Sequence, residues 1–71
     1  MNKEYLSRRI GKRIAQLREK KGMTQADLAR ACMKDRQSIE RIESGNTNPT
    51  AFTLFEIATA LEVPIVEIFR F

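Results

Sequence analysis

Two short amphipathic segments, residues 24–32 and 35–44, constrain the fold most, because only a few residues join them. Their apolar residues recur at the three- and four-residue spacing of a helix. They are Leu28, Ala29 and Cys32 in the first segment, and Ile39 and Ile42 in the second. Two short helices joined this tightly cannot lie antiparallel and still bury both apolar faces. We therefore expect them to cross steeply and to share a core with a third element.

The rest of the chain also predicts helices, because no window shows the sustained alternation of a strand. A first helix of about four turns carries one apolar stripe and ends at Gly22. The stripe consists of Leu6, Ile10, Ile14 and Leu17. Thr24 and Asp27 fit a capping box, Asp35 and Thr50 fit helix caps, and Pro64 suits the start of a fifth, short helix. The prediction is a single all-α domain over residues 1–71, built from five short helices.

Composition excludes several classes of function. A chain of 71 residues with 42% hydrophobic and 31% charged residues is typical of one small globular domain. Its longest apolar run is three residues, so we expect neither a membrane span nor a signal peptide, and we expect a cytoplasmic protein. With no histidine and one cysteine, it has no recognisable catalytic set or metal site, and we expect no enzyme activity and no cofactor.

The charge is unevenly distributed along the chain. The net charge is +4, but residues 1–41 carry twelve basic and five acidic residues, whereas residues 42–71 carry one and four. A basic face is typical of a protein that binds a polyanion such as nucleic acid, although a solubility role would also explain it.

A steeply crossed helix pair has helix-turn-helix geometry, in which the second helix projects from the core. Its projecting residues would be Arg36, Gln37, Ser38, Glu40 and Arg41. Arginine and glutamine are the side chains that read guanine and adenine edges in the major groove. A solvated polar face is the alternative for these positions. Gln25, at the start of the preceding helix, lies where an amide and a helix N-terminus can meet a phosphate.

Three spaced motifs together resemble the phage repressor and Cro type of helix-turn-helix domain, the Xre-like family, from Ile10 to Phe69. They read Gly22-Met-Thr-Gln-Ala-Asp-Leu-Ala, Ser38-Ile-Glu-Arg-Ile-Glu-Ser-Gly45, and Asn48-Pro-Thr followed by Leu54, Ile57-Ala58, Ala60-Leu61 and Val63. The resemblance implies a compact five-helix, lambda-repressor-like fold whose recognition helix, residues 35–44, enters the major groove of double-stranded DNA.

The resemblance also implies a role for individual residues. The positions matching base-reading residues are Arg36, Gln37 and Arg41. Those matching contacts with the DNA backbone are Gln25, Lys34, Ser38, Asn46, Thr47 and Asn48. Arg18 and Glu43 match a salt bridge that orients the recognition helix.

The sequence departs from the family pattern at Met33, where glycine is usual, at Lys34, where a small apolar residue is usual, and at Glu62, where glycine is common. A non-glycine residue at positive φ costs roughly 1 kcal/mol, so we expect the turn around Met33 to be altered or lengthened.

The segment 63–71 is unusually apolar for its length. With one recognition helix reading only a few base pairs, such domains act as two-fold dimers. We expect a dimer seam formed by Phe55, Val66, Phe69 and Phe71, although these residues could instead only close the core.

The resulting hypothesis is a sequence-specific transcriptional regulator that binds a palindromic operator as a homodimer. It would resemble stand-alone repressors or restriction–modification controller proteins. The alternative is an antitoxin-like module, whose C-terminal apolar surface binds a partner protein and whose DNA binding is autoregulatory.

Overall fold

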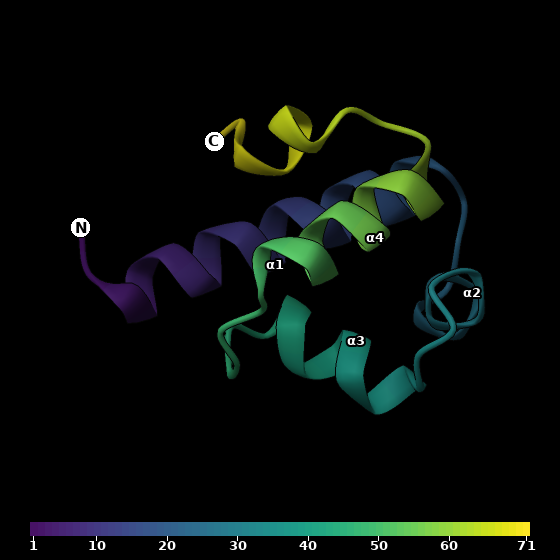
Figure 1. Cartoon of the computed structure of the whole chain (residues 1–71), viewed down its shortest axis with the longest axis horizontal. Helices are drawn as coiled ribbons and strands as arrows, with labels where there is room; N and C mark the ends of the chain where they lie inside the picture. Colours follow the sequence, from purple (N-terminus) through teal and green to yellow (C-terminus); the bar gives the residue numbers. More distant parts are fainter.

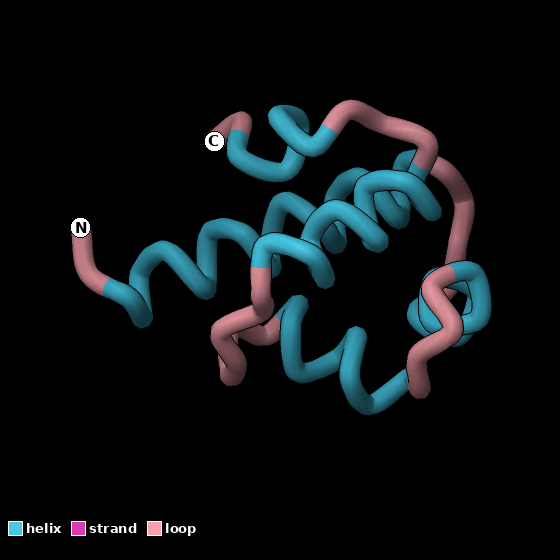
Figure 2. The backbone as a smooth tube through the Cα atoms, viewed as in Figure 1, coloured by secondary structure: helices cyan, strands magenta, loops and turns pink.

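The computed structural model describes all residues, 1–71, and contains helices and loops but no strand (Figures 1 and 2). The helices are α1 (Lys3–Lys20), α2 (Gln25–Ala31), α3 (Arg36–Glu43), α4 (Ala51–Leu61) and the 3₁₀ helix η1 (Ile65–Phe69). In the view of Figure 1, α1 and α4 cross the middle of the molecule, α3 lies below them and η1 lies above. None of these helices is both long and apolar enough to cross a membrane.

The prediction of an all-α fold is confirmed, but the number of α-helices is four and not five. The segment after Pro64 forms only η1, in which the Glu67 amide donates to the Pro64 carbonyl at 2.9 Å. This bond spans three residues, as in a 3₁₀ helix. Five residues leave little room for the bonds of four-residue span that define an α-helix, and η1 has no side-chain cap.

Each α-helix begins at a side-chain cap. Thr24 accepts a hydrogen bond from the Asp27 amide while the Asp27 carboxylate accepts one from the Thr24 amide, which confirms the predicted capping box. The other caps are Asn2 for α1, Asp35 for α3 and Thr50 for α4.

All four α-helices end in the same way. One residue adopts positive φ, and the following amide donates to a carbonyl five residues earlier, which is the Schellman arrangement. The positive-φ residues are Gly22, Met33, Gly45 and Glu62. The turn between α2 and α3 is therefore neither altered nor lengthened. Met33 takes the glycine-like conformation at φ 57°, and the Lys34 amide donates to the Ala29 carbonyl at 2.8 Å.

One core joins all five helical elements. Its buried residues are Ile10, Ile14, Leu28, Ala29, Cys32, Ile39, Ile42, Leu54, Ile57, Ala58, Leu61 and Ile68. The backbones of α1 and α3 pack directly against each other at Gly11. A Cβ atom on Gly11 would lie 2.2 Å from the Ile42 carbonyl oxygen, so only glycine fits there. The position of α3 therefore depends on direct backbone packing against α1.

Candidate nucleic-acid interface

The outward face of α3 is polar, whereas its inward face is anchored in the core. Ile39 and Ile42 are buried, and the exposed residues of the helix are Arg36, Gln37, Glu40 and Arg41. Short helices are held mainly by packing of their apolar face, so these two isoleucines fix the direction of the exposed side chains. The structure thus places all three predicted base-reading residues on one surface.

A largely buried ion pair fixes α3 against α1. Arg18 donates to both carboxylate oxygens of Glu43, from Nε at 2.6 Å and from Nη2 at 3.0 Å. Its Nη1 donates to the Met23 carbonyl at 2.8 Å. The hydrogen bond from Arg18 to the Glu43 carboxylate raises the pKa of Arg18, so the guanidinium stays charged. The structure therefore contains the pair that the family resemblance implied, in the fork geometry that gives Arg–carboxylate pairs their specificity.

The same carboxylate is linked to the outward face of α3 through Gln25. The Gln25 amide nitrogen donates to Glu43 Oε1 at 3.0 Å, and its oxygen accepts from Arg36 Nη1 at 3.1 Å. A continuous path of hydrogen bonds thus runs from Arg18 through Glu43 and Gln25 to Arg36. The sequence pattern does not reveal this path, because its members come from three helices. Gln25 is consequently positioned to orient Arg36, in addition to its predicted contact with phosphate.

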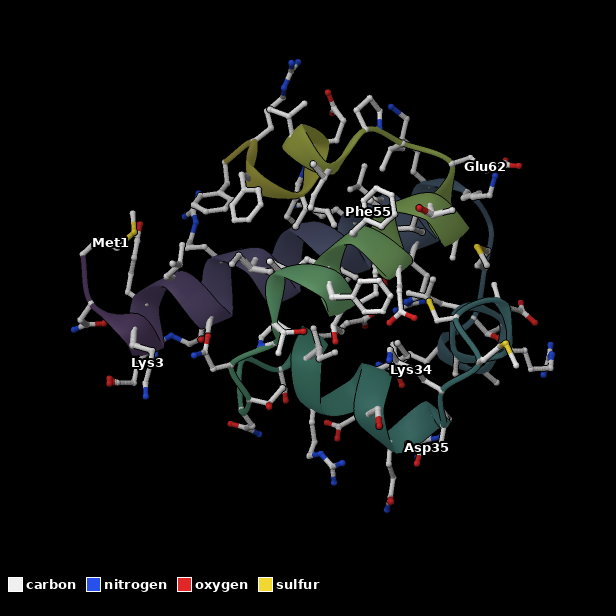
Figure 3. All side chains as sticks on the ribbon, viewed as in Figure 1. Met1, Lys3, Lys34, Asp35, Phe55 and Glu62 are labelled. Carbon is white, nitrogen blue, oxygen red and sulfur yellow. The ribbon has the colours of Figure 1, made fainter.

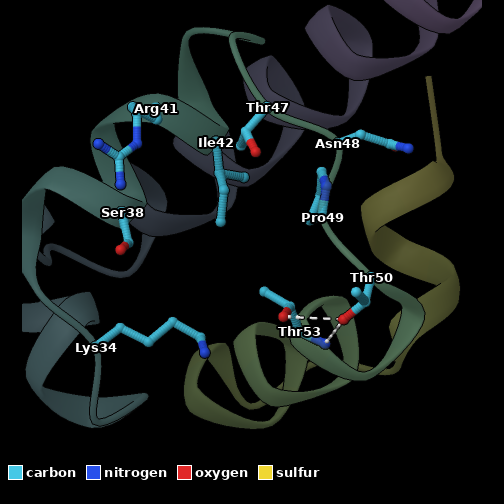
Figure 4. Close-up of a pocket in the computed structure, with 9 residues that line it drawn as sticks. All are labelled: Lys34, Ser38, Arg41, Ile42, Thr47, Asn48, Pro49, Thr50 and Thr53. Carbon is cyan, nitrogen blue, oxygen red and sulfur yellow. Dashed lines mark hydrogen bonds between the residues drawn. The ribbon is translucent and has the colours of Figure 1, made fainter.

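A hollow lies between α3, the loop after it and the start of α4 (Figure 4). Predicted DNA-contacting residues that line it are Lys34, Ser38, Arg41, Thr47 and Asn48. Pro49, Thr50 and Thr53 close it on the α4 side, and the Thr50 hydroxyl accepts a hydrogen bond from the Thr53 amide there. In Figure 4 the amide of Asn48 points away from the hollow. Asn46 is exposed on the same loop but does not line the hollow.

Lys34 differs from the other predicted backbone contacts, because its ammonium group is already paired. Its Nζ lies 3.1 Å from Glu56 Oε1 on α4, and both side chains are largely buried. The pair connects the turn before α3 to α4. Because the two residues lie far apart in the sequence and on separate elements, no sequence signal indicates this contact.

The expected dimer residues lie on the α4 and η1 side of the molecule. The relative exposures of Phe55, Val66, Phe69 and Phe71 are 56%, 57%, 44% and 44%. Phe52, also on α4, is 69% exposed. In Figure 3 the Phe55 ring stands on the near face of α4, away from α3. Roughly half of the surface of these apolar side chains is thus left uncovered by the rest of the chain.

Comparisons with known proteins agree with this geometry. The helix-turn-helix family HTH_3 matches residues 14–68. The chain is 39% identical over 59 residues to the HTH-type transcriptional regulator y4dJ of Sinorhizobium fredii, an alignment that covers 83% of this chain and 77% of y4dJ. It is similar in structure to the restriction-modification controller protein C.AhdI from Aeromonas hydrophila, with TM-score 0.85 and 32% identity over 87% of this chain and 94% of that one. The wild-type controller protein C.Esp1396I gives TM-score 0.85 and 38% identity over 92% of this chain and 84% of that one. The chain therefore belongs to the HTH_3 family, the Xre- and Cro-like class of DNA-binding transcriptional regulators, and it is not an enzyme.

Proposed function

We propose that this regulator binds a two-fold palindromic DNA operator as a homodimer and so controls transcription, in the manner of a stand-alone repressor or a controller protein. The observation that carries this proposal is the outward face of α3. It presents Arg36, Gln37 and Arg41 from a helix that is fixed by two buried isoleucines and by the Arg18–Glu43 pair. Side chains held on a rigid helix can read base edges in the major groove.

Contacts with the DNA backbone would set the register of that helix. Gln25 at the start of α2, Ser38 on α3 and the loop residues Asn46, Thr47 and Asn48 supply polar groups on both sides of the reading face. Contacts of this kind position a protein on the duplex but do not distinguish one base from another. Lys34 would reach a phosphate by exchanging its contact with Glu56.

The homodimer rests on the exposed aromatic surface and on the geometry of DNA. A single recognition helix reads a few base pairs, so useful specificity needs two half-sites about 34 Å apart. Because Phe55 and η1 lie away from the outward face of α3, a second copy could cover them without obstructing the DNA-reading surface. The similarity to two controller proteins supports the proposed role in control.

In vitro selection from random duplex DNA at physiological salt tests the proposal. We expect enrichment of one palindrome, and we expect Phe69→Ser to reduce the affinity for the palindrome more than the affinity for one isolated half-site. Enrichment of a non-palindromic site, bound equally well by wild type and Phe69→Ser, would contradict the dimer. Weak, salt-sensitive binding with no enrichment would contradict sequence-specific recognition.

The antitoxin-like alternative is favoured by one observation, an apolar groove between α2 and α4. Its lining includes Cys32, Met33, Phe52 and Phe55, and Met33 is 94% exposed. Exposed apolar patches mark protein-binding surfaces. A failed DNA selection, together with purification of the protein in a stoichiometric complex with a second chain, would support this function instead.

A further inference from the structure

The C-terminal segment that carries most of the proposed seam has little structure of its own. Its only helical element is η1, a 3₁₀ helix of five residues without a side-chain cap. Ile68 is the one residue of η1 that is buried in the core. A single buried side chain sets how deeply η1 lies in the core but does not set its rotation about that point. Other contacts must therefore set the directions in which Val66 and Phe69 point.

Besides the packing of η1 on α1 and α4, two arginines of α1 supply directional contacts. Arg13 donates from Nε to the Glu67 carbonyl at 2.7 Å and from Nη2 to Glu67 Oε1 at 3.0 Å. Four residues earlier on α1, the Arg9 guanidinium lies over the Phe71 ring, 5.1 Å from its centroid. We name these two contacts, Arg13–Glu67 and Arg9–Phe71, the α1 clasp.

Arg13 contributes the stronger and more directional half of the clasp. Its side chain is 20% exposed and that of Glu67 is 25% exposed, so solvent screens their attraction less than that of a surface pair. Two donors on one planar guanidinium, one bound to the backbone and one to the side chain of the same residue, fix both the position and the orientation of η1. The cation–π contact at Arg9 is weaker at such an exposed site.

The clasp also relates the seam to the DNA-reading helix. The helix that holds η1 through Arg13 contacts the backbone of α3 at Gly11. A displacement of η1 on α1 would therefore change the angle between the seam and α3, and with it the distance between the two recognition helices of a dimer.

We propose that Arg13 is a positioning residue for self-association, which acts by holding η1 so that a second copy of this chain can pack on Val66 and Phe69. This inference rests on the homodimer proposed above. Arg13 itself need not touch the second copy or the DNA.

The test compares Arg13→Gln with Arg70→Gln. Arg70 also pairs with Glu67, at 3.4 Å, but its side chain is 71% exposed. Both residues of this pair lie on the C-terminal segment, so the pair does not link that segment to α1. Both variants remove one positive charge near the same carboxylate, so Arg70→Gln is a matched control. Self-association is measured by sedimentation equilibrium, and DNA affinity is measured separately on one isolated half-site and on the full palindrome, at a temperature where circular dichroism shows every variant folded.

We expect Arg13→Gln to weaken self-association about tenfold or more, the scale of one lost charge-assisted hydrogen bond. We expect its affinity for the half-site to stay within about twofold of wild type, because the reading face of α3 is unchanged. Arg13→Lys, which keeps the charge but not the fork, should fall between wild type and Arg13→Gln, and Arg70→Gln should match wild type.

Equal self-association of wild type and Arg13→Gln would overturn the positioning role, even if the variant melted at a lower temperature. A parallel loss of half-site and palindrome affinity would also overturn it, since that result indicates general damage to the fold. A wild-type chain that stays monomeric at all concentrations would instead refute the homodimer itself, which keeps the two failures distinguishable.

Discussion

Gly11 gives the sharpest test of how α1 holds α3, the proposed recognition helix. A Cβ atom at this position would lie 2.2 Å from the Ile42 carbonyl oxygen and 2.6 Å from that of Glu43, whereas ordinary contact begins at 3.4 Å. The Gly11→Ala variant would therefore have to separate α1 and α3 by about 1 Å, and a backbone oxygen cannot move aside by changing a rotamer. The same change in an exposed helix would stabilise the protein by about 1 kcal/mol, because alanine is the better helix former.

The sign of the effect therefore decides between helix propensity and packing. We expect overpacking to prevail, with a net loss of about 1–3 kcal/mol in the free energy of unfolding. For a domain of this size, that loss corresponds to a melting temperature lower by roughly 5–20 °C. Separation of the helices should also strain the Arg18–Glu43 pair and reduce DNA affinity.

Thermal and urea denaturation followed by circular dichroism measure the effect. Gly22→Ala is the control, because Gly22 has positive φ but a Cβ atom there would meet no other atom within 4 Å. This variant should lose stability through backbone strain alone and leave the α1–α3 contact intact. If Gly11→Ala melted at or above the wild-type temperature, the reasoning that α3 is positioned by backbone contact with α1 would be refuted.

Four further predictions concern single side chains. Met33→Gly should stabilise the fold by about 0.5–1 kcal/mol, measured by urea denaturation. Relief of the positive-φ strain exceeds the cost of the added entropy of the unfolded chain, and removal of an exposed methionine side chain loses no packing. A loss of stability would show that the turn is unstrained. Hydrogen bonds from the backbone amide of Ser38, and then from its side chain, hold the pKa of the Asp35 carboxylate below its ordinary value of 3.8. The carboxylate therefore stabilises the fold above that pH, and this contribution is lost as the pH falls through the lower, folded-state pKa. Asp35→Asn should reduce the loss of stability at acid pH, and an unchanged pH profile of unfolding would disprove the link. Arg36→Ala should cost about 1–3 kcal/mol of discrimination at one base pair of the selected operator. Gln25→Ala should weaken binding to all sequences and also reduce the base preference at that position. An unchanged base preference in Arg36→Ala would exclude Arg36 from base reading.

The sequence predicts those parts of the fold that depend on neighbouring residues. Apolar spacing and caps such as Thr24 and Asp35 act within three or four positions, and they locate the α-helices. The prediction of an altered turn at Met33 is wrong for a different reason. The strain of one left-handed residue, about 1–2 kcal/mol, is a local cost that a shared core can offset.

The features that the sequence does not predict depend on contacts between distant segments. Three contacts join residues whose separation in the sequence carries no periodic signal. They are the Gln25–Arg36 hydrogen bond, the Lys34–Glu56 ion pair and the Arg13–Glu67 hydrogen bond. Residue types alone place arginine and glutamine on the projecting helix. They do not show that Gln25 links Arg36 to the Arg18–Glu43 pair.

The difference between the capped α-helices and the uncapped η1 has a consequence for the order of folding. Each α-helix carries a start signal in its own sequence, a capping side chain, which favours its first turn before distant segments meet. Helical domains dominated by such local contacts fold within microseconds to milliseconds. The position of η1, in contrast, is fixed only after Ile68 packs into the core of the bundle and Arg13 of α1 binds Glu67. A newly made chain would thus form the outward face of α3 first, as a monomer, and only then the C-terminal surface on which we propose that a second copy assembles.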